Sequence, residues 1–188
     1  VCFIDKEQIT ICGSAAIIGA GVAITAAHVL DSKLMDNVHD GLQSLYCLGP
    51  REGSADIWRV TSLTTLAPDT DIAFLNLELN SERDPLEFFT VPLTTRHPSV
   101  GELVTVLGFV FGTFHKTADL LWSLLGARGF VTNVYPGGRD ATMVPFPAIE
   151  VMCGSPKGTS GGVVLDSDSN LLGVVSTSLD AEDGRGPT

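Results

Sequence analysis

Short β-prone runs separated by glycine and proline recur along this chain of 188 residues, and they limit its fold more than any other feature. Typical runs are 44–48, 72–77 and 103–107, which are shorter than most helices and rich in branched, aromatic and other apolar residues. Stretches of turn-forming residues such as 49–54 and 136–140 punctuate the chain between runs. Many short strands joined by such turns predict an all-β sandwich or barrel.

A polar, proline-containing stretch at residues 86–99 divides these runs into two groups. This composition is typical of a linker that crosses the surface between folded units. We therefore expect one unit over residues 1–85 and a second over residues 100–188. Within the second unit, residues 119–125 fit a short helix as well as a strand, and the pattern alone leaves both open.

The composition excludes several classes of protein. Because 44% of the residues are hydrophobic and only 18% are charged, the chain can bury a sizeable core and is not disordered by composition. No apolar stretch of roughly 18 residues is present, so no membrane span is expected. The net charge of −11 would repel phosphate backbones and anionic membranes, which argues against nucleic acid or a membrane surface as a partner.

Four cysteines are spread along the chain without a Cys-x-x-Cys pair: Cys2, Cys12, Cys47 and Cys153. Such spacing argues against a zinc knuckle and against a disulfide framework. We therefore expect buried free thiols, with no metal and no cofactor.

Ser160 lies between glycines in the stretch 158–162, a Gly-x-Ser-x-Gly pattern. Flanking glycines leave its hydroxyl uncrowded and the nearby backbone N–H groups free, as a nucleophile on a tight turn requires. The same pattern marks the nucleophile of α/β-hydrolases, in which the acid and the histidine follow the serine. Only 28 residues follow Ser160 and none is histidine, so this alternative fails and the partners must lie upstream.

A histidine and an aspartate occupy suitable upstream positions. Small residues precede His28, so the chain can turn closely there and project the imidazole as a general base. Asp71 directly precedes the apolar run 72–77, which would hold its carboxylate partly buried; we prefer it to Asp69, which follows a proline in the turn. The competing interpretations are a core or capping histidine and an ordinary turn aspartate. The other histidines lie in polar or loop contexts and receive no role: His39, His97 and His115.

Three motifs in this order, TAAH at 25–28, DIAFL at 71–75 and GTSGG at 158–162, resemble the signature regions of chymotrypsin-like (trypsin-fold) serine peptidases. The resemblance covers nearly the whole chain. It implies two packed six-stranded antiparallel β-barrels, an N-terminal one with His28 and Asp71 and a C-terminal one with Ser160. The second barrel is expected to be incomplete, because the family has one more strand than the remaining residues would supply.

The resemblance also implies roles for individual residues and a serine endopeptidase activity. His28 would accept the proton of the Ser160 hydroxyl as it attacks a peptide carbonyl, and Asp71 would hold the imidazole in the right tautomer. The backbone N–H groups of Gly158 and Ser160 would form the oxyanion hole. The alternative from another class is a catalytically silent trypsin-like module used for binding or scaffolding within a larger protein.

By the same resemblance, Gly154 would form the base of the substrate pocket, where trypsin-type members carry an aspartate. Ser176, Thr177 and Ser178 would line its wall, and the backbone of Ser176 and Ser178 would pair with an extended protein or peptide substrate. We therefore expect a preference for uncharged residues before the cleaved bond, unless the acidic residues 180–183 fold back on the pocket.

Two departures from the digestive members of the family are informative. Thr159 stands where zymogen-activated members carry an aspartate, so activation by a freed N-terminus is not expected. Val29 follows the histidine where secreted members commonly carry a disulfide-bonded cysteine, which favours a reducing, cytoplasmic compartment. The chain is thus more similar to HtrA-like and other intracellular members, and further domains or a regulatory partner are expected.

Overall fold

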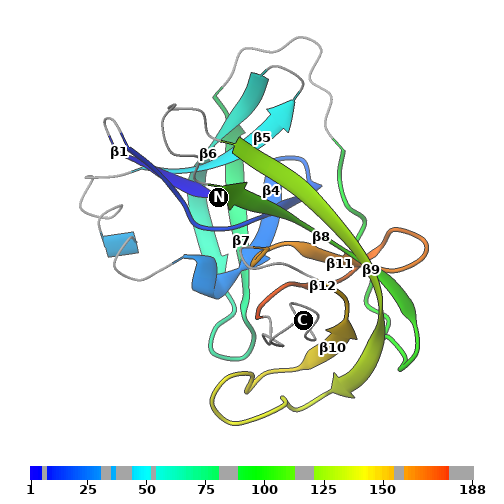
Figure 1. Cartoon of the computed structure of the whole chain (residues 1–188). Helices are drawn as coiled ribbons and strands as arrows, with labels where there is room; N and C mark the ends of the chain where they lie inside the picture. Colours follow the sequence, from blue (N-terminus) through cyan, green and yellow to red (C-terminus); the bar gives the residue numbers. More distant parts are fainter. Residues whose placement is uncertain are drawn as a thin grey trace.

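The computed structural model describes residues 1–5, 8–30, 35–36, 44–51, 54–80, 89–112, 121–154 and 159–177. Its strands form two antiparallel sheets, one of seven strands and one of five (Figure 1). The seven-stranded sheet has the order β2-β1-β5-β6-β7-β4-β3 and the five-stranded sheet the order β10-β9-β8-β11-β12. The predicted all-β, two-barrel chymotrypsin-like fold is confirmed, with the strands divided seven and five rather than six and six.

The first sheet consists of β1 (Cys2–Asp5), β2 (Gln8–Ile11), β3 (Ala16–Gly19), β4 (Val22–Ala26), β5 (Ser44–Arg51), β6 (Ser54–Thr65) and β7 (Ile72–Leu79). A single turn of 3-10 helix, η1 (Ala27–Val29), follows β4. The second sheet consists of β8 (Leu103–Gly112), β9 (Leu121–Tyr135), β10 (Ala148–Met152), β11 (Val163–Leu165) and β12 (Leu171–Val174).

The count of seven arises at the N-terminus, where β1 pairs with both β2 and β5. Its consecutive residues Cys2 and Phe3 are each 1% exposed, so both faces of this strand are covered. In the second sheet, β10 and β12 are the edge strands, and no sixth strand joins them among the described residues.

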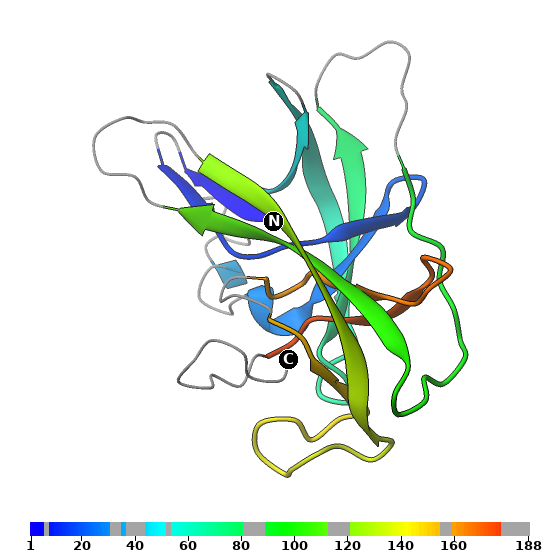
Figure 2. The same cartoon turned by 45° about the vertical axis from the view of Figure 1, so that its right-hand side comes forward.

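The ambiguous stretch 119–125 is a strand where the structure describes it. Residues 121–125 belong to β9 because each of them pairs with β8, from Leu121 opposite Gly112 to Leu125 opposite Gly108. A partner strand thus decides between helix and strand where the local pattern could not. The resulting β8–β9 hairpin is long and extends from the five-stranded sheet toward the seven-stranded one (Figure 1 and Figure 2).

Apolar side chains hold each half together and also join the halves. Within the first sheet they gather around Phe3, Trp58 and Leu75, and within the second around Val104, Val131 and Val151. A third cluster joins Ile24 of β4 to three residues of β11 and β12: Val163, Leu165 and Leu171. The two halves therefore share a core beneath the strand ends that carry the candidate site.

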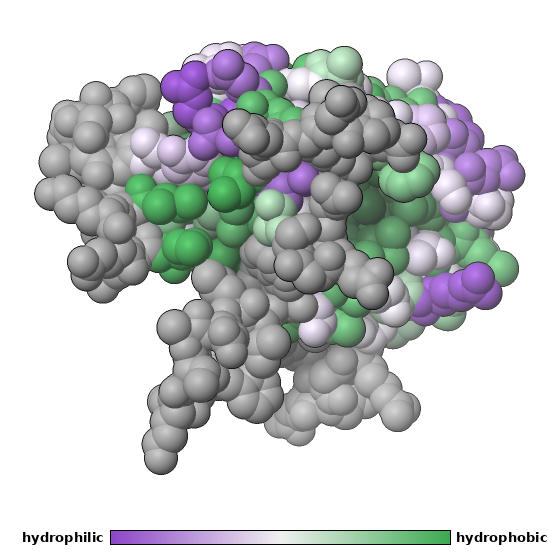
Figure 3. Space-filling view, turned by 90° about the horizontal axis from the view of Figure 1, so that it is seen from above, coloured by the Kyte–Doolittle hydropathy of each residue, from purple (hydrophilic) through white to green (hydrophobic). Residues whose placement is uncertain are grey.

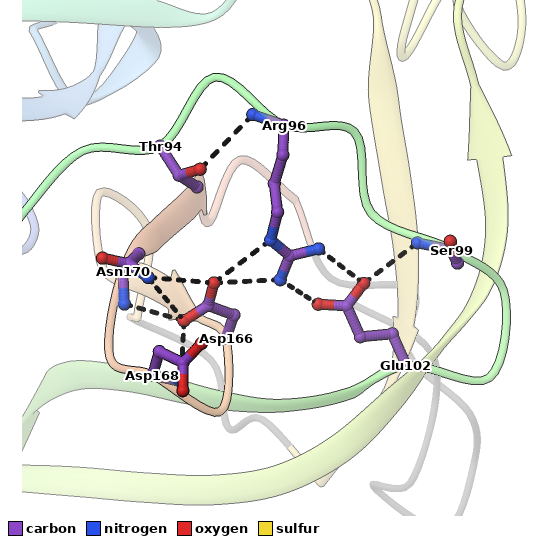
Figure 4. A network of polar contacts seen from close by, with 7 residues as sticks. All are labelled: Thr94, Arg96, Ser99, Glu102, Asp166, Asp168 and Asn170. Carbon is purple, nitrogen blue, oxygen red and sulfur yellow. Dashed lines mark hydrogen bonds and ion pairs between the residues drawn. The ribbon is translucent and has the colours of Figure 1, made fainter.

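Residues 89–98 lie between the sheets and bond to both. The Val91 N–H donates to the Ile17 carbonyl of β3 (2.8 Å), and the Leu171 N–H of β12 donates to the Pro92 carbonyl (2.7 Å). Further along, the Arg96 guanidinium binds the Asp166 carboxylate (2.9 Å) and the Glu102 carboxylate (Figure 4). This segment falls within the predicted linker 86–99, whose full bounds stay a prediction because 81–88 lie outside the described residues.

On the face seen from above, hydrophobic residues line a hollow, and hydrophilic residues lie to the right of it (Figure 3). Among the described residues, no helix has the length and apolar character needed to cross a membrane.

Candidate active site

His28 lies on the 3-10 turn that follows β4. The small residues before it are packed, with Ala26 fully buried, and the Ala27 N–H donates to the Asp71 carbonyl (3.2 Å). This bond continues the pairing of β4 with β7 beyond Ala26 and Ile72. The His28 side chain projects from the turn with 47% of its area exposed. The small residues at 26 and 27 therefore bring the imidazole next to Asp71.

The Asp71 carboxylate holds His28 at two points. His28 Nδ1 lies 2.7 Å from Asp71 Oδ2, and the His28 backbone N–H donates to Oδ1 (2.9 Å). When Nδ1 carries the proton of this bond, a neutral imidazole has Nε2 free to accept another proton. The predicted pairing of these residues is thus present in the structure, whereas Asp69 lies exposed in the preceding turn.

A third bond reaches Asp71 from the second half of the molecule. The Ser176 hydroxyl donates to Asp71 Oδ2 at 2.5 Å. Burial raises the pKa of Asp71, but the hydrogen bonds from His28 and Ser176 outweigh it, so the net shift is downward and the carboxylate stays ionised at neutral pH. The sequence pointed to Ser176 only as a pocket residue, because nothing local reveals a contact with a residue 105 positions away.

Ser160 occupies a tight turn, as its glycine-rich surroundings predict. The Gly162 N–H donates to the Thr159 carbonyl (2.8 Å), and Gly161 has a φ of +80°. This geometry is that of a type II turn, which requires glycine at its third position. A Cβ on Gly161 would also collide with the Ser14 carbonyl and the Thr25 hydroxyl, so glycine is required on two grounds.

His28 and Ser160 are not hydrogen-bonded to each other in the structure. Within the described part of the chain, no hydrogen bond joins His28 to Ser160, and neither the hydroxyl nor the N–H of Ser160 has a partner. Catalytic hydrogen bonds are often long in the absence of substrate. The Ser160 hydroxyl is therefore not engaged by another group of the described chain.

Two of the predicted site residues, Gly158 and Ser178, lie outside the described residues. Gly154 is exposed, with open space where a Cβ would lie, so its role as the base of a pocket stays a prediction.

A cavity of about 480 Å³ adjoins the acid of this site, and Asp71, Ser176 and Thr177 lie in its wall. Most of the wall is apolar, with contributions from Phe146, Ile149, Leu172 and Val174. Thr70 also lines it, and its buried hydroxyl has no hydrogen-bond partner among the described residues. Because charged side chains such as Arg96, Arg139 and Glu150 also lie in the wall, the cavity suits a mainly apolar group that carries some polar atoms.

No cluster of three His, Cys, Asp or Glu side chains that could hold a metal occurs among the described residues. All four cysteines are free thiols, and burial raises the pKa of Cys2 to about 12. A thiol with such a pKa is neither a nucleophile nor a ligand at neutral pH.

Comparison with known proteins identifies the family. The sequence pattern of the trypsin-like peptidase domain matches residues 13–174, most of the chain. Solved structures share the fold at low identity. The HtrA-type protease AlgW in complex with a decapeptide is 20% identical, with a TM-score of 0.62 over 96% of this chain and 48% of its own.

Two mammalian structures are similar over 99% of this chain. Human heparin binding protein is 18% identical, with a TM-score of 0.61 over 82% of its chain. Neuropsin, a serine protease of mouse brain, is 19% identical, with a TM-score of 0.59 over 85% of its chain. No curated protein sequence matches this chain significantly. With a family pattern that spans most of its length and the two-barrel fold, the chain belongs to the trypsin-like peptidase domain family.

Proposed function

We propose that the protein is a serine endopeptidase in which Ser160 is the nucleophile, His28 the general base and acid, and Asp71 the group that orients His28. The observation that carries this proposal is the bond between His28 Nδ1 and Asp71 (2.7 Å), which leaves Nε2 as the free nitrogen of an exposed imidazole. In a member of a peptidase family, that arrangement supports proton transfer more directly than a structural role.

In the proposed reaction the Ser160 oxygen bonds to the carbonyl carbon of the peptide while its proton passes to His28 Nε2. The N–H groups of Gly158 and Ser160 would stabilise the oxygen that becomes negative. Collapse of this intermediate breaks the C–N bond, and His28 returns the proton to the leaving amine. Water then hydrolyses the Ser160 ester by the same steps, with Asp71 ionised throughout.

The apolar cavity beside Asp71 supports a peptide or protein substrate with uncharged, bulky side chains. Ser176 and Thr177 lie in its wall, as expected for residues that contact an extended substrate chain. We propose Gly154 and Ser178 as further contacts, and a regulatory partner or additional domains as the source of control.

The test is the variant Ser160→Ala, compared with Ser123→Ala, which changes an exposed serine of β9. We expect Ser160→Ala to abolish both peptide hydrolysis and covalent labelling by a fluorophosphonate, since both need the hydroxyl. Ser123→Ala should retain both. Labelling that persists in Ser160→Ala would contradict the proposal.

The absence of a bond between His28 and Ser160 favours a second candidate, a silent module that binds extended peptides. If the protein is such a module, a fluorophosphonate should not label the unaltered protein at any pH, and peptides should bind to it saturably. A fluorophosphonate titration alongside a peptide-binding measurement separates the two functions.

A further inference from the structure

The Ser160 turn rests against the first half of the molecule through Ser14. The Ser14 N–H donates to the Ser160 carbonyl at 2.7 Å, and this bond joins the loop between β2 and β3 to the turn before β11. Ser14 is only 2% exposed, so water does not compete effectively for its polar groups.

Thr25 holds Ser14 in turn. The Thr25 hydroxyl donates to the Ser14 carbonyl at 2.7 Å, and Thr25 is fully buried on β4. Three residues later the same segment carries His28. One short piece of chain thus bears the proposed base and, through Ser14, supports the turn that bears the proposed nucleophile.

Ser14 also contacts the long hairpin of the second half. Its Oγ accepts a hydrogen bond from the Phe109 N–H of β8 at 2.8 Å. The N–H, the carbonyl and the hydroxyl of Ser14 therefore each form a hydrogen bond with a different segment, at Ser160, Thr25 and Phe109 respectively.

The contacts between Ser14, Thr25 and the Ser160 turn leave little space. A Cβ on Gly161 would overlap with both the Ser14 carbonyl and the Thr25 hydroxyl, and a Cβ on Gly13 would lie 2.7 Å from the Ser160 carbonyl. With so little space, the Ser160 turn can shift only if Ser14 or Thr25 shifts too.

We propose that Ser14 and Thr25 are positioning residues that set the Ser160 hydroxyl relative to His28 across the junction of the two halves, an inference that rests on the proposed peptidase function. Neither side chain touches the reacting atoms. They act by fixing the backbone on which Ser160 sits, and a displacement of about 1 Å at a reacting group can lower a rate by roughly two orders of magnitude.

The decisive variant is Thr25→Val, which keeps the shape of the side chain and removes its donor. It leaves the buried Ser14 carbonyl without that donor. We expect kcat and the rate of fluorophosphonate labelling to fall roughly tenfold or more, while KM changes less than about twofold. Thr25→Ser restores the donor and should recover most of the rate.

Two further variants complete the design. Ser14→Ala removes the acceptor of Phe109 and should slow labelling severalfold by the same route. Thr61→Val is the matched control, because the Thr61 hydroxyl also donates to a backbone carbonyl in the first sheet, that of Asn76 (3.3 Å). We expect its rates to match those of the unaltered protein.

Amide hydrogen exchange at Ser14 gives a readout that does not depend on activity. Because this N–H is donated to Ser160, we expect slow exchange in the unaltered protein and clearly faster exchange in Thr25→Val but not in Thr61→Val. If the folded Thr25→Val and Ser14→Ala proteins keep the unaltered kcat and labelling rate, the positioning role is wrong. If the unaltered protein is never labelled, the peptidase function is wrong. If exchange at Ser14 is then also unchanged in Thr25→Val, the support of the Ser160 turn by Ser14 and Thr25 is wrong as well.

Discussion

Two polar joins hold the second half of the molecule, one to the first half and one to the linker, and they differ chemically. At the Ser160 turn the join is neutral and buried, and consists of backbone groups and the hydroxyls of Ser14 and Thr25. At the linker the join is ionic, between an Arg96 side chain that is 43% exposed and the carboxylates of Glu102 and Asp166. The first join lies at the candidate nucleophile, and the second lies at the far end of the β11–β12 hairpin (Figure 4).

The two joins are expected to affect different properties, the neutral join the position of Ser160 and the ionic join the stability of the fold. Neutral buried hydrogen bonds stabilise a fold only modestly, but they are short and directional, and leaving one partner unpaired is costly. Ion pairs to an exposed arginine add attraction that tolerates small displacements and weakens with salt. We therefore expect the neutral join to control the reaction rate and the ionic join to control stability.

The largest effect is expected from Gly161→Ala at the neutral join. The new methyl group would collide with the Ser14 carbonyl at a residue whose φ is +80°, so the turn must rearrange. We expect labelling of Ser160 to fall by roughly two orders of magnitude or more, measured with a fluorophosphonate. Gly137→Ala is the control, because nothing lies within 4 Å of a Cβ there. A Gly161→Ala protein that reacts at the normal rate would refute the view that this join controls placement.

The sequence was sufficient for the parts of the molecule that depend on local patterns. Beyond the pairing of His28 with Asp71, 43 positions apart, which the family resemblance implied, the small residues before His28 predicted a close turn and the glycines around Ser160 predicted a tight turn. In each case, the residue types within a few positions decide the backbone geometry.

Contacts between distant segments could not be predicted in this way. Ser176 reaches Asp71 and Ser14 reaches Phe109 across 105 and 95 positions, and the strand at 121–125 depends on its pairing with β8. The division of strands into seven and five likewise depends on which edges meet in space. Such features follow from packing of the whole chain, on which single residue patterns carry no information.

A smaller effect, on stability rather than rate, is expected from Arg96→Ala at the ionic join. The substitution leaves the Asp166 carboxylate, which is 2% exposed, without its cation. We expect the thermal midpoint to fall by several degrees while the labelling rate of Ser160 stays within about twofold.

The control for this variant is Arg59→Ala, which breaks an exposed pair with Glu78 in the first sheet, where both side chains are more than half exposed. Its midpoint should change by about one degree or less. A large loss of rate in Arg96→Ala, with a normal midpoint, would reverse the assignment of the two joins.

The smallest effect is expected from pH, and it tests the ionic character of the second join alone. Burial raises the pKa of Asp166, but hydrogen bonds from the Asn170 N–H and from Arg96 outweigh it, so the pKa lies at about 2 instead of 3.8. A carboxylate with a lowered pKa contributes stability that is present above the ordinary pKa and is lost as pH falls toward the lowered one. The midpoint difference between the unaltered protein and Asp166→Asn should therefore be constant above about pH 5 and shrink between about pH 4 and pH 2.

Ser14 and Thr25 do not titrate in this range, so the midpoint difference caused by Ser14→Ala should stay the same over the whole interval. A pH-dependent Ser14→Ala difference, or a constant Asp166→Asn difference, would show that the two joins are not chemically distinct.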